Sequence, residues 1–384
     1  MVYLNHGSFG SCPLAVLEYQ RRLRERMESR PMQFLVRDLE ELLDQARSSL
    51  ARFVGADSED LVFIPNATTG VNTVLRSLRW EIGTELLVTD HEYNACRNAL
   101  EYAAGCSSAK VKVVSLPFPF EDERQLIEPL LAAVSNRTRL ALLDHVSSQT
   151  GIVFPIQRLV GELEGRGVEV LVDGAHAPGM VPLDLRRLGV TYYTGNCHKW
   201  LCAPKGAAFL YVTRERQSSI RPLSISHGAN SPRKDRSRFQ LEFGWTGTHD
   251  PSAFLSVPEA LQFMGGLLPG GWPEVIDRNH ALALAARRVL CDKLGIQVPC
   301  PDASIGAMAS VPIPDAPKST RPSSPLYSDL LQDRLCRIDG IEVPVISWPA
   351  PPKRLLRVSA QLYNSLPQYE RLAEALMEAE RQPS

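Results

Sequence analysis

Lys199 and Asp173 are the two residues whose types and spacing most directly predict chemistry. Lys199 lies in Thr-Gly-Asn-Cys-His-Lys-Trp (194–200), and Asp173 lies in Val-Glu-Val-Leu-Val-Asp-Gly-Ala-His-Ala (168–177). A lysine buried among apolar residues and near other cations loses part of its preference for the ammonium form, so its amine can attack an aldehyde. Such an amine and a carboxylate that keeps a pyridine nitrogen protonated are the groups that a pyridoxal phosphate (PLP) site needs most.

The segments before these residues indicate where both side chains lie. Residues 168–172 and 191–194 form short β-rich runs, so Asp173 and Lys199 follow the carboxyl ends of predicted strands. Open α/β sheets bind their ligands at that edge. Taken singly, a turn aspartate and a solvated lysine are the commoner interpretations. We favour the PLP site because further motifs fall at the same edge.

A third motif, Ile-Pro-Asn-Ala-Thr-Thr-Gly-Val-Asn (64–72), predicts an anion site. Asn66 is a good N-cap for the helical pattern that follows, which leaves N–H groups of Ala67, Thr68 and Thr69 in the first turn. Because a helix N-terminus binds anions, we expect it to receive the cofactor phosphate. An ordinary capped helix is the alternative.

Other polar residues follow predicted strands or flank the lysine. His91 and Tyr93 come after one strand, where either ring could stack on the cofactor. One of four side chains after another strand is expected to reach the phenolic oxygen of the cofactor: His145, Ser147, Ser148 or Gln149. Asn196 and His198 are candidates for the phosphate, with a packed loop histidine as the alternative for His198.

Short β-rich runs alternate with amphipathic stretches in the first part of the chain. The predicted strands are 61–64, 85–89, 111–115, 139–143, 168–172, 191–194 and 207–211, with helical patterns at 66–79, 125–134 and 156–165. Seven strands with helical crossovers predict an α/β fold built on a mainly parallel sheet that is covered on both faces.

The pattern changes after about residue 250, where a smaller α+β unit is predicted. Its expected parts are helices at 272–294, 326–338 and 367–380, a Pro- and Ser-rich surface loop at 311–325 and a strand at 340–346. A chain of 384 residues exceeds the usual single-domain range. We predict an N-terminal segment (1–20) near the site that packs with the small domain, a large PLP-binding domain (21–250) and a small C-terminal domain (251–384).

Composition favours small-molecule chemistry. With 42 basic and 43 acidic side chains the net charge is −1, which gives no argument for nucleic acid or an anionic membrane. The eight cysteines form no CxxC pair, so free thiols in a reducing compartment are expected. No apolar run reaches the roughly 18 residues of a membrane span, and the start does not read as a signal peptide. We predict a cytoplasmic protein.

Eight motifs stand along the chain: Asn-His-Gly-Ser-Phe-Gly (5–10), Asn-Ala-Thr-Thr (66–69), Asp-His-Glu-Tyr-Asn (90–94), Asp-His-Val-Ser-Ser (144–148), Asp-Gly-Ala-His (173–176), His-Lys-Trp (198–200), Trp-Thr-Gly-Thr-His-Asp (245–250) and Arg-Val-Ser-Ala-Gln-Leu-Tyr-Asn (357–364). Together they resemble the class V aminotransferase family, and its isopenicillin N epimerase-like branch in particular. They stand in family order along nearly the whole chain, so the resemblance is specific.

The resemblance implies a fold-type I PLP enzyme, usually a homodimer with its sites at the subunit interface. Lys199 would carry the cofactor as an aldimine, Asp173 would hold its pyridine nitrogen, and His176 would contact its phenolic oxygen. His91 falls where the family places its ring-stacking residue, with Tyr93 as the second choice. Phosphate and neighbouring contacts would come from Ala67, Thr68, Thr69, Ser148, Asn196 and His198, with Thr248 of the partner subunit.

The resemblance also implies an amino-acid substrate. Arg357 matches the family's arginine for the α-carboxylate, which a guanidinium binds through two parallel hydrogen bonds. Asn5, His6 and Tyr93 are the other expected substrate contacts. No metal site is predicted.

Three hypotheses for function follow. The first is an epimerase acting at the α-carbon of an amino acid, or of an amino-acid side arm on a larger molecule. The second is a C–S lyase or an aminotransferase, since all these reactions begin with loss of the same α-proton. The third is a PLP-fold binding module without turnover, which the intact Lys199 and Asp173 disfavour.

Departures from the family pattern narrow these choices. Cysteine desulfurases of this superfamily carry a persulfide-forming cysteine shortly before the arginine motif, but 340–352 has none and Cys336 lies upstream. Desulfurase activity is therefore disfavoured. Ser148 stands where many relatives have Asn. Packing roles are expected for Cys197 and Cys202.

Overall fold

The computed structural model describes residues 1–316 and 329–381. Its largest element is a seven-stranded sheet of order β2-β8-β7-β6-β5-β3-β4. The strands are β2 (Leu61–Ile64), β3 (Glu85–Thr89), β4 (Lys110–Val114), β5 (Thr138–Asp144), β6 (Glu169–Asp173), β7 (Tyr192–Asn196) and β8 (Ala208–Val212). β8 runs antiparallel to both neighbours, and the other pairs are parallel. The predicted mainly parallel α/β sheet is confirmed.

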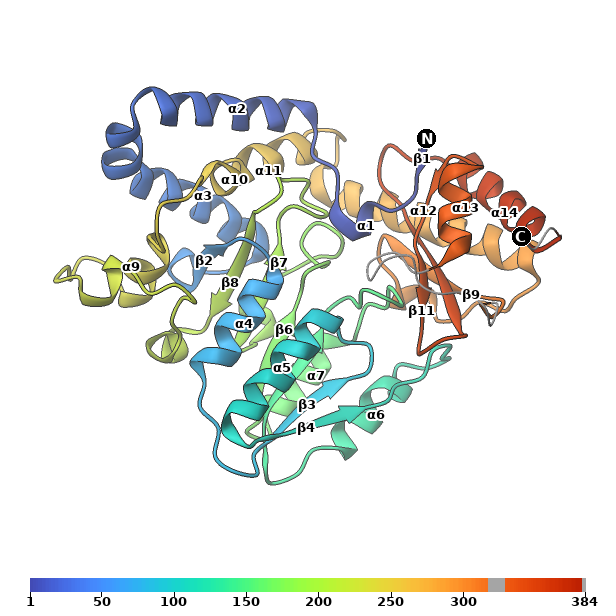
Figure 1. Cartoon of the computed structure of the whole chain (residues 1–384), viewed down its shortest axis with the longest axis horizontal. Helices are drawn as coiled ribbons and strands as arrows, with labels where there is room; N and C mark the ends of the chain where they lie inside the picture. The colour runs from blue at the N-terminus through green and yellow to red at the C-terminus, as the bar shows by residue number, and fades with distance from the viewer. Residues whose placement is uncertain (317–328, 382–384) are drawn as a thin grey trace.

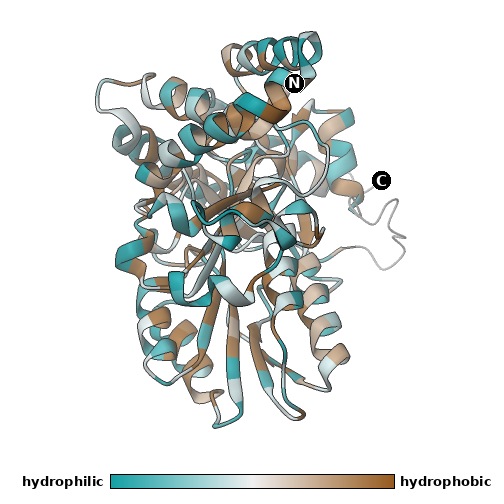
Figure 2. Cartoon of the chain, turned by 90° about the vertical axis from the view of Figure 1, so that its left-hand side faces the viewer, coloured by the Kyte–Doolittle hydropathy of each residue, from teal (hydrophilic) through white to brown (hydrophobic). Residues whose placement is uncertain are grey.

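Two helical layers cover this sheet, and the central strand β5 shows why. Leu140 and Leu142 pack with α4 (Ala67–Ser77) and α5 (Asn94–Ser107). Ala141 and Leu143 face the opposite layer, which includes α6 (Arg124–Ala132) and α7 (Ile156–Glu164). A strand buried on both faces must be apolar at successive positions. Figure 2 accordingly shows hydrophobic residues along the strands and mixed colours along the flanking helices.

A second, antiparallel sheet of order β11-β12-β9 lies in the C-terminal part. It comprises β9 (Met308–Ile313), β11 (Val345–Ser347) and β12 (Arg354–Ser359), with α12 (Gly271–Leu294), α13 (Leu330–Arg337) and α14 (Leu366–Arg381) beside it (Figure 1). The short strand β1 (Val2–Tyr3) pairs with β10 (Ile341–Glu342), so the N-terminus joins this α+β unit. The predicted small α+β part is confirmed.

Three details of this part differ from the prediction. Residues 311–313 belong to β9 rather than to a loop, and 317–325 of that predicted loop lie outside the described residues. Helix α13 begins at Leu330 because the Asp329 side chain caps it, while 326–328 are not described. The predicted strand 340–346 is two strands, β10 and β11, since Pro344 between them has no N–H to donate.

The remaining helices surround the first sheet. Helices α2 (Leu14–Ser29) and α3 (Leu39–Val54), joined by a π-helix (Gln33–Asp38), contact α10 (Ser252–Leu255) and α11 (Val257–Gly265) (Figure 1). The domain limits at 20 and 250 stay predictions. Shorter helices are α1 (His6–Phe9), α8 (Leu185–Leu188), α9 (Arg238–Gly244) and the 3₁₀ turns Ser58–Asp60, Arg214–Ser219, His227–Asn230 and Asp302–Ser304. Among the described helices, none is both long and apolar enough to cross a membrane.

Candidate active site

Asp173 lies at the carboxyl edge of the sheet, where β6 ends. It pairs in register with Asp144 of β5 and Thr194 of β7, so three strand ends meet there. Its Oδ1 accepts a hydrogen bond from the N–H of Ala175 (2.9 Å), and its Oδ2 accepts one from Sγ of Cys96 on α5 (3.0 Å). These two bonds fix the orientation of a carboxylate that is 3% exposed.

Lys199 follows β7 and carries its amine to the same edge. Its Nζ lies 3.0 Å from Nε2 of His176. Burial lowers the pKa of Lys199 to about 8; the Asp173 carboxylate opposes this shift and the Arg357 cation adds to it. The reactive free amine is therefore far more populated near neutral pH than for a solvated lysine.

Arg357, on β12, is a buried cation that has no acidic partner among the described residues. One Nη donates to the carbonyl and hydroxyl of Ser148, and the other donates to Oγ of Ser8 (2.8 Å). Its Nε has no hydrogen-bond partner within the described structure, and burial lowers the pKa of Arg357 to about 10. A buried guanidinium left in this state is suited to a carboxylate ligand.

Two further buried acids lie beside Asp173. Oε2 of Glu92 and Oδ2 of Asp144 have no hydrogen-bond partner in the described part of the chain. Burial raises the pKa of both carboxyls well above the usual range, and the charge of Asp173 adds to each shift. Burial and the neighbouring charge thus favour the protonated form of both carboxyls, which reduces the repulsion among three adjacent acids.

The N-terminus of α4 has the predicted cap. The Asn66 side chain accepts hydrogen bonds from the N–H (2.8 Å) and the hydroxyl (3.1 Å) of Thr69. Asn196, at the end of β7, accepts one from the N–H of Ala67 (2.9 Å). Both donors of Thr69 serve the cap, whereas the N–H of Thr68 belongs to the same first turn, whose N–H groups have no partner within the helix. Thr69 also lines a separate, mostly apolar cavity of about 250 Å³ that does not include Lys199.

His91 does not lie where a stacking residue must. Its ring is fully buried, with Nδ1 bonded to Thr150 Oγ1 (3.0 Å) and Nε2 to the carbonyl of Leu116 (3.2 Å). It packs edge-on against Trp348. A ring with no exposed surface cannot cover a cofactor, so the geometry corrects the first choice. Tyr93 is 43% exposed and near enough to Asp173 for that charge to help raise its pKa, which favours the second choice.

The N-terminal motif supports the site from behind. His6 is fully buried, with Nδ1 bonded to the hydroxyl of Tyr363 (2.9 Å) and Nε2 to the carbonyl of Lys199 (3.1 Å). It therefore holds the lysine backbone and presents no surface to a substrate, contrary to the prediction. Asn5 donates to Glu342 (3.1 Å) and lies 3.5 Å from an Nη of Arg357.

The other candidate side chains divide between structural contacts and the site. His145 bonds to the hydroxyl of Tyr193 (2.9 Å), and Ser147 to that of Thr150 (2.5 Å), so both are committed elsewhere. His198 bonds to the carbonyl of Ala207 (2.9 Å). Thr248 lies on the exposed segment after α9, and its role from a partner subunit stays a prediction.

Five residues of the site are not among those predicted from the sequence. Cys96 on α5 and Glu92 just before it approach Asp173, Asp144 lies beside it at the end of β5, Trp200 contacts His176, and Ser8 holds Arg357. All except Cys96 stand within the motifs that carry the family resemblance, so their position is a usable signal. Cys96 carried none, because its side chain reaches the site only through the packing of α5 on the sheet.

Comparisons with known proteins place the whole chain among its relatives. Residues 10–313 match the family model described as aminotransferase class-V. The chain is 37% identical to isopenicillin N epimerase of Amycolatopsis lactamdurans, covering 98% of this chain and 94% of that protein. It is 30% identical to a probable chloroplastic L-cysteine desulfhydrase of Arabidopsis thaliana, covering 97% and 82%. A solved C-DES mutant with glycine covalently linked to its PLP cofactor superposes with a TM-score of 0.78 at 23% identity, covering 98% and 96%.

The chain belongs to the class V aminotransferase family of PLP-dependent enzymes. This membership confirms the predicted family, cofactor and class of enzyme, and the structural likeness confirms the predicted fold. The relatives include both an epimerase and a desulfhydrase, so the reaction is a separate question.

Proposed function

We propose that this enzyme acts at the α-carbon of an amino acid, with Lys199 as its reacting amine and PLP bound at the carboxyl edge of the sheet. One observation carries the proposal. The oriented Asp173 carboxylate and the Arg357 guanidinium both lie close enough to the Lys199 amine to shift its pKa. Arg357 has no acidic partner among the described residues.

The buried polar groups fit this cofactor. The Thr68 N–H at the N-terminus of α4 suits the phosphate, joined by the positions of Ala67 and Asn196. Asp173 suits the pyridine nitrogen, Nε2 of His176 suits the phenolic oxygen, and the half-exposed Tyr93 suits the ring face. When bound, PLP withdraws electrons from the α-carbon of an attached amino acid and makes its α-proton acidic.

Arg357, Lys199 and Asp173 would each have a separate role in the reaction. Arg357 binds the α-carboxylate through paired hydrogen bonds, which fixes the α-carbon relative to Lys199. Lys199 takes the α-proton at Nζ, because its lowered pKa leaves a reactive fraction of free amine at neutral pH. The raised pKa values of Glu92 and Asp144 favour their neutral forms, so Asp173 is the acid of this cluster that we assign to a cationic ring nitrogen.

Epimerisation is the leading reaction. The support is the 37% identity to an isopenicillin N epimerase over nearly the full length of both proteins. In this reaction a proton is returned to the opposite face of the α-carbon, and the substrate is an amino acid or an amino-acid side arm of a larger molecule.

C–S lysis is the second candidate, favoured by the 30% identity to a probable L-cysteine desulfhydrase. It uses the same Lys199 and Arg357 and differs in what leaves the β-carbon. Transamination shares the first step as well, and it would release a keto acid.

The test separates these reactions in one experiment. The PLP-loaded protein is incubated in D₂O with isopenicillin N, L-cysteine and a panel of L-amino acids. We expect deuterium at the α-carbon and a D-configured product. Pyruvate released together with sulfide would favour the lyase, and a keto acid that retains the side chain of the substrate, without sulfide, would favour the aminotransferase. Lys199→Ala should abolish exchange, whereas the exposed Lys205→Ala should retain it. Absence of exchange with every substrate would refute the proposal.

Two further expectations accompany this function. We infer a homodimer in which Thr248 of one protomer reaches the phosphate of its partner, and analytical ultracentrifugation together with Thr248→Ala tests both points. The cytoplasmic location also stays a prediction.

A further inference from the structure

We propose that Trp200 is a positioning residue that fixes the tautomer of His176 and thereby favours the free-amine form of Lys199. The proposal rests on the function above only in taking Lys199 as the reacting group. Three side chains form a chain of contacts. Indole Nε1 of Trp200 donates to Nδ1 of His176 (3.4 Å), and Nε2 of His176 lies 3.0 Å from Nζ of Lys199.

The direction of the hydrogen bond from Trp200 to His176 determines which nitrogen of His176 carries the proton. An indole N–H is a donor only, so Nδ1 of His176 must present a lone pair. A neutral imidazole carries one proton, which then resides on Nε2 and points at the lysine. An ammonium group offers three donors and no acceptor, so this N–H can be received only by the lone pair of a free amine.

The surroundings keep His176 neutral. The ring is 2% exposed, and burial lowers its pKa well below the usual range. Arg357, His198 and His6 shift the pKa of His176 in the same direction, and so does Lys199 when it is protonated. A cationic ring would also place an N–H against the indole N–H, so protonation of His176 meets both obstacles.

Trp200 is held firmly enough to act in this way. Its side chain is 1% exposed and packs against the ring of His6, with centroids 4.9 Å apart. His6 in turn bonds to the carbonyl of Lys199 (3.1 Å) and to Tyr363 (2.9 Å). The N-terminal motif and the segment after β12 thus converge on the residue next to the lysine, which gives His6 a role that does not involve substrate.

Protonating Lys199 is unfavourable in this arrangement. The ammonium would have to donate to Nε2, which requires the other His176 tautomer and breaks the indole hydrogen bond. Removing the indole N–H removes this penalty, so we expect the Trp200→Phe variant to raise the pKa of Lys199 by about one unit.

The first measurement is ¹⁵N NMR of the full-length, cofactor-free protein labelled at histidine, with His176→Gln to assign the signal. Above pH 8, where the Lys199 amine is mostly free, we expect a neutral His176 ring with the proton on Nε2. A proton on Nδ1, or a cationic ring at that pH, would overturn the proposal. This measurement needs no variant of Trp200 and no turnover, so its outcome is independent of whether the enzyme is an epimerase or a lyase.

The second measurement is the pKa of Lys199 itself, from the pH dependence of trace acetylation followed by mass spectrometry. Trp200→Phe is compared with Trp272→Phe. The second variant removes another indole N–H, which donates to the backbone carbonyl of Leu261 (2.9 Å) and contacts neither His176 nor Lys199. Only Trp200→Phe should raise the pKa. Equal values in both variants would contradict the tautomer mechanism, and if Trp200→Phe does not fold, the NMR result alone decides.

Discussion

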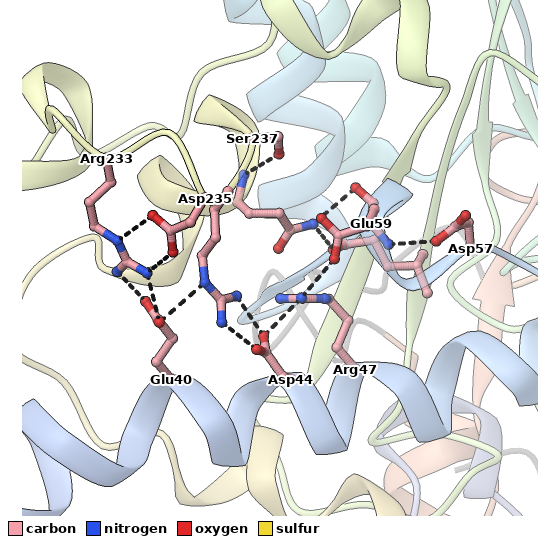
Figure 3. Close-up of polar contacts among 11 residues, drawn as sticks. Glu40, Asp44, Arg47, Asp57, Glu59, Arg233, Asp235 and Ser237 are labelled. Atoms are coloured by element: carbon pink, nitrogen blue, oxygen red, sulfur yellow. Dashed lines mark hydrogen bonds and ion pairs between the residues drawn. The ribbon is translucent and has the colours of Figure 1, made fainter.

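Arg357 and the arginines along helix α3 show two opposite ways of placing a guanidinium. Beside α3, Arg236 bonds to both carboxylate oxygens of Asp44 (2.9 and 2.5 Å), and Arg233 bonds to Glu40 and Asp235 (Figure 3). Arg47 joins the same network through Asp44. Arg357 is more deeply buried than any of these and is bound only by neutral groups.

The paired arginines beside α3 stabilise the fold, whereas the unpaired Arg357 is suited to binding a ligand. The network in Figure 3 ties the segment 233–237 to α3 and leaves its charges matched. At the sheet edge the chain leaves unmatched groups instead: the Arg357 cation and two carboxyl oxygens of Glu92 and Asp144 without partners among the described residues. An unpaired buried charge reduces stability, so the Arg357 guanidinium, which influences the pKa of Lys199 and has no acidic partner among the described residues, indicates that a ligand completes it.

Removing the Arg357 charge should give the largest effect. Arg357→Leu is expected to raise KM for an amino-acid substrate at least about a hundredfold, because the α-carboxylate loses a paired, desolvated partner. Arg357→Lys should recover only part of this loss, since an ammonium cannot form two parallel bonds. The control is Arg236→Leu, for which steady-state kinetics should show an unchanged KM. Equal KM values for both leucine variants would contradict the claim that Arg357 binds the substrate and Arg236 does not.

The pH dependence of the Lys199 amine is the next effect. The pKa of Lys199 is about 8, so the free-amine fraction rises about tenfold per pH unit below that value and levels off above it. The rate of PLP attachment, followed by absorbance, should show the same profile. A profile that keeps rising to about pH 10.5, the usual lysine range, would mean that burial does not act on this amine.

Two carboxyl-to-amide substitutions compare the regions in stability. Asp44→Asn should cost about 1 to 2 kcal/mol, because Arg236 and the partly buried Arg47 lose a charged partner. Glu92→Gln should not lower the free energy of unfolding at pH 8, and it can raise it. The folded-state pKa of Glu92 is raised, so wild-type stability falls as pH rises above about 4.5, and the amide variant lacks that loss.

Urea unfolding at pH 5 and pH 8 measures this comparison. The advantage of Glu92→Gln over the wild type should grow between the two pH values, whereas the Asp44→Asn deficit should shrink in high salt. A Glu92→Gln deficit as large as that of Asp44→Asn would show that the Glu92 carboxyl is paired and charged.

The smallest expected effect concerns the cap of α4. Asn66→Ala should cost about 1 kcal/mol of stability by removing the acceptor for the Thr69 N–H. It should also weaken PLP binding, because the first turn loses its fixed geometry. Asn66→Asp keeps the acceptor and should restore stability, and calorimetry with PLP titration distinguishes the two effects. Unchanged PLP affinity in the alanine variant would place the phosphate elsewhere.

The sequence predicted most of the first sheet because its strands are apolar runs that any doubly covered sheet requires. It did not predict β9 and β12, since β9 contains Pro312 and pairs with β12 across a long interval of chain. Lys199, Asp173 and Asn66 could be placed because each directly follows or caps a local element. His91 and Tyr93 could not be ranked, because both lie in the turn between β3 and α5, where the sequence does not determine the direction of each side chain. The indole bond of Trp200 depends on packing that no local pattern records.

The most direct test of the central claim is to trap the cofactor on the chain. The protein is incubated with PLP, reduced with borohydride, digested and analysed by mass spectrometry, so that any lysine joined to PLP carries a stable label. We predict the label on Lys199. A label confined to other lysines, or no label, would contradict the account of this edge of the sheet as the active site.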